Sequence, residues 1–138
     1  MASLYETVGG QPFFDELARR FYEEVRSDEV LLALYPDPED LGPAAERLAL
    51  FLAQYWGGPT TYSDRRGHPR LRMRHAPYRI GGDERDRWLR AVTTALAATV
   101  DPTAGHLGEL DAAERSQVER QLLDYLTMAA DHLVNDPS

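Results

Sequence analysis

A histidine lies among arginines and between two prolines in the stretch from Gly67 to Ile80, and its setting suits metal chemistry. Pro69 fits the first position of a helix, and Pro77 would end that helix just after the histidine. Leu71 lies four residues before His75, so the two side chains share one helical face. A histidine on a short, apolar-faced turn is what a haem iron needs as an axial ligand.

Between Arg65 and Gly82 there are six arginines and no acidic residue, although the whole chain has a net charge of −8. A guanidinium group pairs with a carboxylate in a forked geometry, and haem carries two propionate carboxylates. The alternative to a haem site is a stretch without a ligand, because a single histidine is usually packed or surface-exposed and an arginine run is usually a solvated face. The arginines are Arg65, Arg66, Arg70, Arg72, Arg74 and Arg79.

Length and composition favour one helical domain over residues 1–138, with 43% apolar residues to build a core. The chain has no cysteine, which excludes disulfides, thiolate metal sites and cysteine nucleophiles and is typical of a cytoplasmic protein. No secretory signal and no membrane-spanning run is visible. The negative charge argues against nucleic acid and membrane as partners.

Helical periodicity recurs along the chain without strand-like alternation, so the sequence predicts an all-α fold. One predicted helix begins at Pro12 and presents an apolar face at spacings of three and four residues. Asp83 is expected to be the N-cap of a helix that runs to about residue 100, and Asp111 with Glu114 forms a capping-box pattern. The other expected helices are 4–8, 28–35, 43 to about 56 and the turn before residue 75; the last helix frays at 135–137, and 60–67 and 101–110 are expected to be loops.

Two motifs, Gln54–Pro59 and Gly67–Pro77, together with Trp88 and two diglycine breaks, carry a resemblance to a known family. From about Leu4 to Asn135 the chain resembles the truncated haemoglobins, within them the second group that is common in actinobacteria. This resemblance implies a truncated globin fold, a two-over-two helical sandwich around haem b (iron protoporphyrin IX).

The resemblance also implies a role for individual residues. His75 matches the proximal ligand of a five-coordinate iron, and its second ring nitrogen is expected to donate to a carbonyl such as that of Leu71. Tyr22, Tyr35 and Trp88 match the groups that stabilise a bound ligand on the opposite haem face. The matches to the distal pocket lining are Ala44, Leu48, Phe51 and Leu52, and the expected propionate contacts are Arg74 and Tyr62.

Three functions follow as hypotheses. The first is binding or transport of dioxygen, with carbon monoxide and nitric oxide as further ligands. The second is a redox enzyme, either peroxidase-like or a nitric oxide dioxygenase, which would need a separate reductase. The third is a helical interaction module without cofactor. The sequence does not choose among transport, sensing and catalysis, because all use the same pocket. Apolar residues on the outer helices are compatible with a homodimer.

Overall fold

A computed structural model describes residues 2–136, except for the side chain of Arg72. Within this range every regular element is a helix. The elements are α1 (Leu4–Thr7), α2 (Gln11–Arg26), α3 (Glu29–Leu32), α4 (Gly42–Tyr55), α5 (Thr61–Arg66), α6 (Leu71–His75), α7 (Gly82–Val100), the 3₁₀ turn η1 (Pro102–Ala104) and α8 (Ala112–Leu133).

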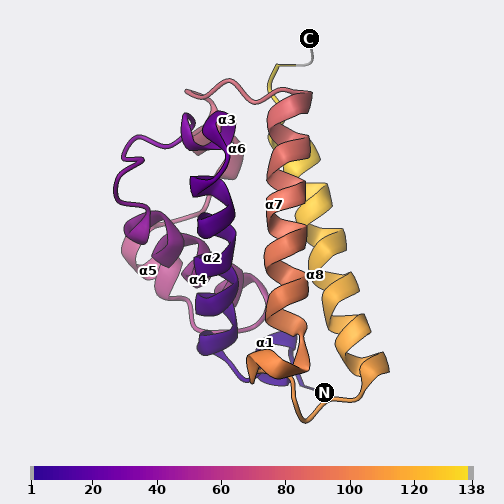
Figure 1. The fold of residues 1–138 in the computed structure, drawn as a ribbon. Helices are drawn as coiled ribbons and strands as arrows, with labels where there is room; N and C mark the ends of the chain where they lie inside the picture. Colours follow the sequence, from indigo (N-terminus) through magenta and orange to yellow (C-terminus); the bar gives the residue numbers. More distant parts are fainter. Residues whose placement is uncertain (1, 137–138) are drawn as a thin grey trace.

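Four long helices form the frame of the molecule. Helix α2 packs against both α4 and α7, and α7 packs along α8. Figure 1 shows α7 and α8 side by side, with α2, α4 and the short helices α3, α5 and α6 grouped opposite them. This arrangement confirms the predicted all-α fold of two helical pairs. Among the described residues, no helix has the length and apolar character needed to cross a bilayer.

The apolar face predicted for α2 forms the centre of the core. Phe14, Leu17, Phe21 and Val25 are all fully buried, and Pro12 stands in the first turn of the helix as expected. The capping box at the start of α8 is also present, because Asp111 accepts from the Glu114 N–H at 2.8 Å while Glu114 accepts from the Asp111 N–H at 3.0 Å. Local periodicity and capping signals therefore located the long helices well.

The expected loop at 60–67 was wrong, because residues 61–66 form α5. This helix buries only Tyr62, so it has no apolar periodicity that a sequence could reveal. A side chain from α4 holds it instead: Gln54 Oε1 accepts from the Ser63 N–H at 2.9 Å, and Gln54 Nε2 donates to Ser63 Oγ at 2.7 Å. The helix thus depends on a contact between two elements.

The predicted starts of two other helices also need correction. Helix α6 begins at Leu71 and not at Pro69, because Arg70 before it adopts a left-handed backbone with φ of 44°. Helix α7 begins at Gly82, so Asp83 lies in its first turn and is not the N-cap. The orphan N–H of Gly81 is bound by Glu84 Oε1 at 2.8 Å, which provides the cap from inside the helix.

The expected fraying after α8 was wrong at Asn135, and Pro137 lies outside the described residues. Asn135 donates its backbone N–H to the Ile80 carbonyl at 2.9 Å, and its side-chain Oδ1 accepts from the Ile80 N–H at 2.8 Å. Its Nδ2 also donates to the Tyr78 carbonyl at 2.8 Å. The end of the described chain is therefore tied to the segment that follows α6.

A tight turn ends α4. Gly57 has φ of 103°, and the Gly58 N–H donates to the Ala53 carbonyl at 2.7 Å, which closes the last helical turn. A Cβ atom on Gly58 would lie 2.6 Å from the Tyr5 ring and 2.8 Å from the Ala53 carbonyl oxygen. The N-terminal segment can pack on this turn only because residue 58 has no side chain.

Gly58→Ala should therefore lower the free energy of unfolding by about 1–3 kcal/mol, as expected for overpacking against backbone. Urea unfolding followed by circular dichroism measures the loss. Gly82→Ala is the matched control, since a Cβ there meets nothing closer than 4.0 Å, and it should be neutral or slightly stabilising. Equal effects of the two substitutions would contradict the steric argument.

Candidate functional site

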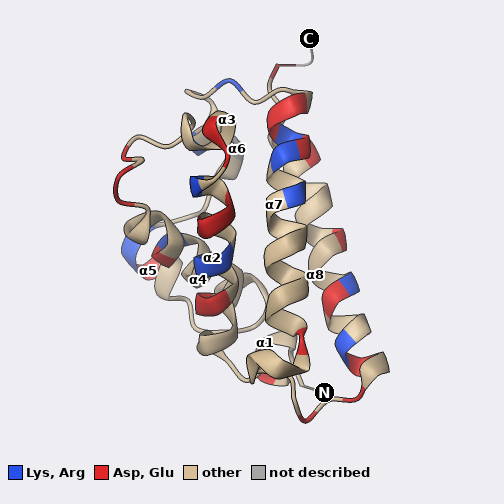
Figure 2. Ribbon diagram, in the orientation of Figure 1, with Lys and Arg blue, Asp and Glu red and all other residues tan. Residues whose placement is uncertain are grey.

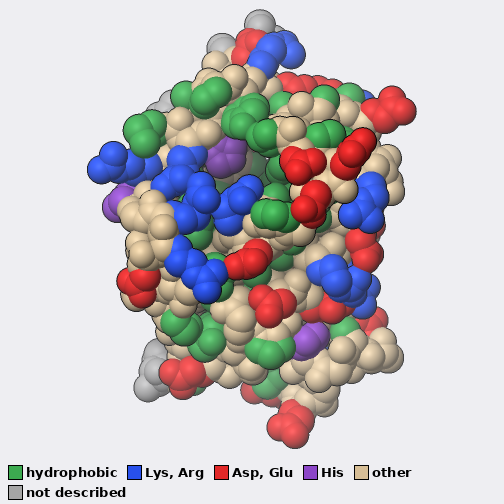
Figure 3. Space-filling view, turned by 90° about the vertical axis from the view of Figure 1, so that its left-hand side faces the viewer, with side chains coloured by type: hydrophobic (Ala, Val, Ile, Leu, Met, Phe, Trp, Pro, Cys, Tyr) green, Lys and Arg blue, Asp and Glu red, His purple; other side chains and the backbone are tan. Residues whose placement is uncertain are grey.

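A cavity of about 350 Å³ lies between the group α2–α3–α4 and the group α6–α7–α8. Its volume lies in the range of small-molecule and cofactor sites. All the site residues expected from the sequence line it. They are Tyr22, Tyr35, Ala44, Leu48, Phe51, Leu52, Tyr62, Arg74, His75 and Trp88. Figure 3 shows the hollow, with a cluster of basic side chains on one side of its opening and acidic side chains across from them.

His75 is the last residue of α6, and its ring is held in one orientation. Its Nδ1 lies 2.7 Å from the Leu71 carbonyl oxygen, the contact expected from the sequence. A carbonyl oxygen can only accept, so the proton belongs on Nδ1 and the lone pair on Nε2. The side chain is therefore prepared to bind a metal through Nε2.

The donor set around His75 suits a metal that brings most of its own ligands. Among the described residues, no group of three or more histidine and acidic side chains could hold a bare ion. A single neutral imidazole in an apolar cavity is instead the axial ligand set of a haem iron, whose four equatorial ligands come from the porphyrin. The residues present thus fit haem.

Aromatic rings form a continuous wall on the side of the cavity built from α2, α7 and the turn after α3. The Trp88 ring lies 5.3 Å from Phe21, Phe21 lies 4.9 Å from Tyr22, and Tyr22 lies 5.4 Å from Tyr35, all centre to centre. Each pair is close to edge-to-face, which is the favoured geometry for aromatic rings. Each of the three polar members carries one hydrogen-bond donor, and that of Tyr35 is used on Tyr22.

The two tyrosines of this wall keep their protons well into the alkaline range. Burial raises the pKa of Tyr22, while a hydrogen bond from Tyr35 and the positive charge of Arg47 reduce that rise. Burial also raises the pKa of Tyr35 well above its ordinary value, and the contact with Tyr22 raises it further. Both hydroxyl groups are thus neutral donors at physiological pH.

Several arginines line the cavity and its opening. Arg74 is fixed by two backbone carbonyls, because its Nε donates to Pro69 at 2.7 Å and its Nη2 to Arg66 at 2.8 Å. Arg66 and Arg85 also line the cavity, as does Arg47. The sequence analysis did not single out Arg47, although its spacing of three residues from Ala44 could have located it.

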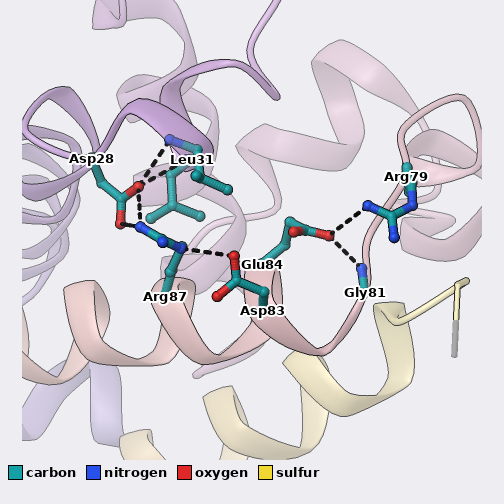
Figure 4. A network of polar contacts seen from close by, with 8 residues as sticks. Asp28, Leu31, Arg79, Gly81, Asp83, Glu84 and Arg87 are labelled. Atoms are coloured by element: carbon teal, nitrogen blue, oxygen red, sulfur yellow. Dashed lines mark hydrogen bonds and ion pairs between the residues drawn. The ribbon is translucent and has the colours of Figure 1, made fainter. Parts of the chain in front are cut away.

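A polar network joins α7 to both sides of the cavity (Figure 4). Asp28 caps α3 by accepting from the Leu31 N–H at 3.2 Å, and Arg87 donates to the same carboxylate at 3.1 Å. Burial opposes ionisation of Asp28, but these two contacts outweigh it, so the pKa of Asp28 is lowered. The contact between Arg87 and Asp28 therefore sets the spacing between α3 and α7, and it also helps to position Trp88, the residue after Arg87.

Comparisons with known proteins agree with this geometry. Residues 3–129 match the family of bacterial-like globins. The group 2 truncated hemoglobin YjbI of Bacillus subtilis is 33% identical over 131 residues, which cover 95% of this chain and 87% of that protein. The structure of a thermostable hemoglobin from the actinobacterium Thermobifida fusca is 54% identical, with a TM-score of 0.85 and coverage of 99% and 100%.

One further solved structure is informative. The truncated oxygen-avid haemoglobin from Bacillus subtilis is 31% identical to this chain, with a TM-score of 0.80. The alignment covers 97% of this chain and 100% of that structure. The similarity therefore extends over the whole frame and includes both walls of the cavity.

Asp28→Ala should lower the free energy of unfolding by about 1–2 kcal/mol at neutral pH, because α3 loses its N-cap and Arg87 loses a partner. Asp86→Ala is the control, since Asp86 is exposed and, among the described residues, pairs only with Arg85 on the surface. The difference between Asp28→Ala and the unchanged protein should shrink below about pH 4, where the aspartate of the unfolded chain takes up a proton first. Denaturant titrations at neutral and acid pH test this, and a difference that grew in acid would contradict it.

Proposed function

The chain belongs to the bacterial-like globins, in the second group of truncated haemoglobins, and we propose that it binds haem b in the cavity with His75 as the proximal ligand. The observation that carries the proposal is the 2.7 Å contact between His75 Nδ1 and the Leu71 carbonyl. It supports the assignment because the ring is oriented and its Nε2 is left to coordinate. We further propose that the bound haem takes up dioxygen reversibly.

The cavity walls supply the contacts that haem needs. Arg74, Arg66 and Arg47 lie where carboxylates of a bound porphyrin could pair with them, and Tyr62 offers a hydroxyl group. Leu48, Phe51 and Leu52 give the apolar lining that excludes water, and the small side chain of Ala44 leaves the opposite wall free of a competing histidine.

Haem iron supplies the site at which a diatomic ligand binds, and the protein decides how firmly that ligand is held. Tyr22, Tyr35 and Trp88 all line this cavity, in surroundings where a hydrogen bond is electrostatically strong. The Trp88 N–H and the Tyr22 O–H can donate to the ligand, while Tyr35 donates to Tyr22 and orients it. The oxygen-avid relative from Bacillus subtilis supports dioxygen as the ligand. Carbon monoxide and nitric oxide would occupy the same position. A cytoplasmic location and a homodimer stay predictions from the sequence.

A second function is favoured by one specific observation. The rings of Tyr55 and Tyr125 are stacked, and this pair connects the cavity with the surface. We propose peroxide reduction on the same haem as this second activity, since tyrosine side chains can carry oxidising equivalents. Nitric oxide dioxygenation would equally need electrons from outside. In either case, a separate reductase or a small reductant must supply them.

His75→Gly should abolish the spectrum of five-coordinate ferrous haem, because the iron loses its axial nitrogen. Added imidazole should restore the spectrum by occupying the vacated space. Absorption spectra of haem-reconstituted protein measure both effects. His68→Ala is the matched control, since His68 is exposed and outside the cavity lining. Unchanged spectra in His75→Gly would refute the proximal assignment.

Trp88→Phe should speed dioxygen dissociation about fivefold, which corresponds to loss of one hydrogen bond of about 1 kcal/mol. Stopped-flow replacement of dioxygen by carbon monoxide measures the rate. Trp56→Phe removes the other tryptophan, which is not among the cavity-lining residues and whose N–H has no partner in the described chain. An equal rate in Trp88→Phe and the unchanged protein would exclude Trp88 as a donor.

A further inference from the structure

Four aromatic residues form a second group of rings at the end of α4 and on α8, which we call the surface aromatic cluster: Phe51, Tyr55, Trp56 and Tyr125. The rings of Tyr55 and Tyr125 are stacked, with centres 4.0 Å apart and planes inclined by 29°. Trp56 lies 5.2 Å from Tyr55 and 5.8 Å from Tyr125. Phe51 lies 6.5 Å from Tyr55. Every member therefore neighbours another member.

The two ends of the cluster lie in different surroundings. Tyr125 and Phe51 line the cavity. Tyr55, stacked directly on Tyr125, is 52% exposed to solvent. One ring-to-ring contact thus leads from the proposed haem site to the surface. Electron transfer weakens steeply with distance, so a stacked pair of oxidisable rings is a favourable route.

Packing alone does not account for the cluster. An aromatic pair that served only to join α4 to α8 would gain from burial, but Tyr55 is half exposed. The indole N–H of Trp56 is buried and has no hydrogen-bond partner among the described residues. Buried polar groups are normally paired, so this indole is not placed by hydrogen bonding within the described chain.

Proton release decides where an oxidising equivalent would settle. A tyrosine that loses an electron also loses its phenolic proton, so it needs a proton acceptor close by. Burial and the neighbouring Tyr55 raise the pKa of Tyr125 to about 12, and its proton is held firmly. The half-exposed Tyr55 lies at the surface, where water can take the proton. The oxidised state is therefore expected at Tyr55.

We propose that Tyr125 and Tyr55 conduct electrons from small phenolic reductants at the protein surface to a haem in the cavity. The inference rests on the proposed function, because haem must react with a hydroperoxide to supply the oxidising power. The hydroperoxide accepts two electrons and two protons and leaves as an alcohol and water. Tyr55 gives up one electron and one proton at a time, and each time it recovers both from one phenol, which leaves as a phenoxyl radical.

Phenols are the reductants that the geometry favours. Exchange of an electron and a proton between two phenolic groups changes little in bond energy, so the reaction at Tyr55 needs no strong driving force. Contact with the exposed ring also requires no entry into the cavity, so phenols that do not fit beside a bound haem can react. Without a reductant, two oxidised Tyr55 rings from separate molecules would couple through a carbon–carbon bond.

The test uses haem-reconstituted protein treated with hydrogen peroxide in the absence of reductant. Dityrosine fluorescence and denaturing gels detect cross-linked dimers, and peptide mass spectrometry with a spin trap locates the oxidised residue. The variants are Tyr55→Phe and Tyr125→Phe. Tyr5→Phe is the matched control, because Tyr5 is partly exposed but stacks on Phe14 and does not line the cavity. The haem absorption spectrum of each variant reports folding and cofactor uptake.

We expect the spin-trap adduct on Tyr55, loss of the cross-linked dimer in Tyr55→Phe, a lower Tyr55 adduct yield in Tyr125→Phe, and no change in Tyr5→Phe. Labelling elsewhere with none on Tyr55, or an unchanged yield in Tyr125→Phe, would overturn the inference while haem binding stands. If the unchanged protein took up no haem, the proposed function would fail and the route with it.

Discussion

The rest of the cavity depends on a single hydrogen bond, from His75 Nδ1 to the Leu71 carbonyl. It fixes the ring tautomer and therefore the direction in which the imidazole can coordinate. Five helical residues are enough to form this contact, because donor and acceptor lie four positions apart on one turn. The remainder of the chain has to bring an opposing wall of suitable chemistry to the correct distance from Nε2.

Helix α7 provides much of that distance control. Its first turns carry Glu84, which caps the segment after α6, and Arg87, which binds Asp28 at the start of α3. The proximal and distal sides are thus connected to one rigid element, and Trp88 is next to Arg87 in sequence. Ion pairs and caps that contribute modestly to stability can in this way determine the geometry of the cavity.

Much of this architecture could be read from the sequence because the signals were local. The apolar spacing on α2, the capping box at Asp111 and the turn ending at His75 each depend on residues within one or two helical turns. The wrong predictions fall where the sequence carries no local signal for the structure. Helix α5 depends on Gln54, nine residues before Ser63. The late start of α6 follows from a left-handed Arg70, a conformation that residue type does not predict outside glycine and asparagine. Arg47 is exposed at the edge of the cavity, and its helical spacing from Ala44 was the one local signal for it.

The tie between Asn135 and residues 78–80 has a consequence for synthesis. Asn135 also donates to the His75 carbonyl at 3.4 Å, so it contacts the whole stretch from α6 to α7 across nearly 60 residues. During translation the N-terminal helices leave the ribosome first. The segment that carries His75 can be fixed only after Asn135 has emerged. The cofactor site should therefore mature only after α8 is complete, and a nascent chain stalled before that point should retain cofactor poorly.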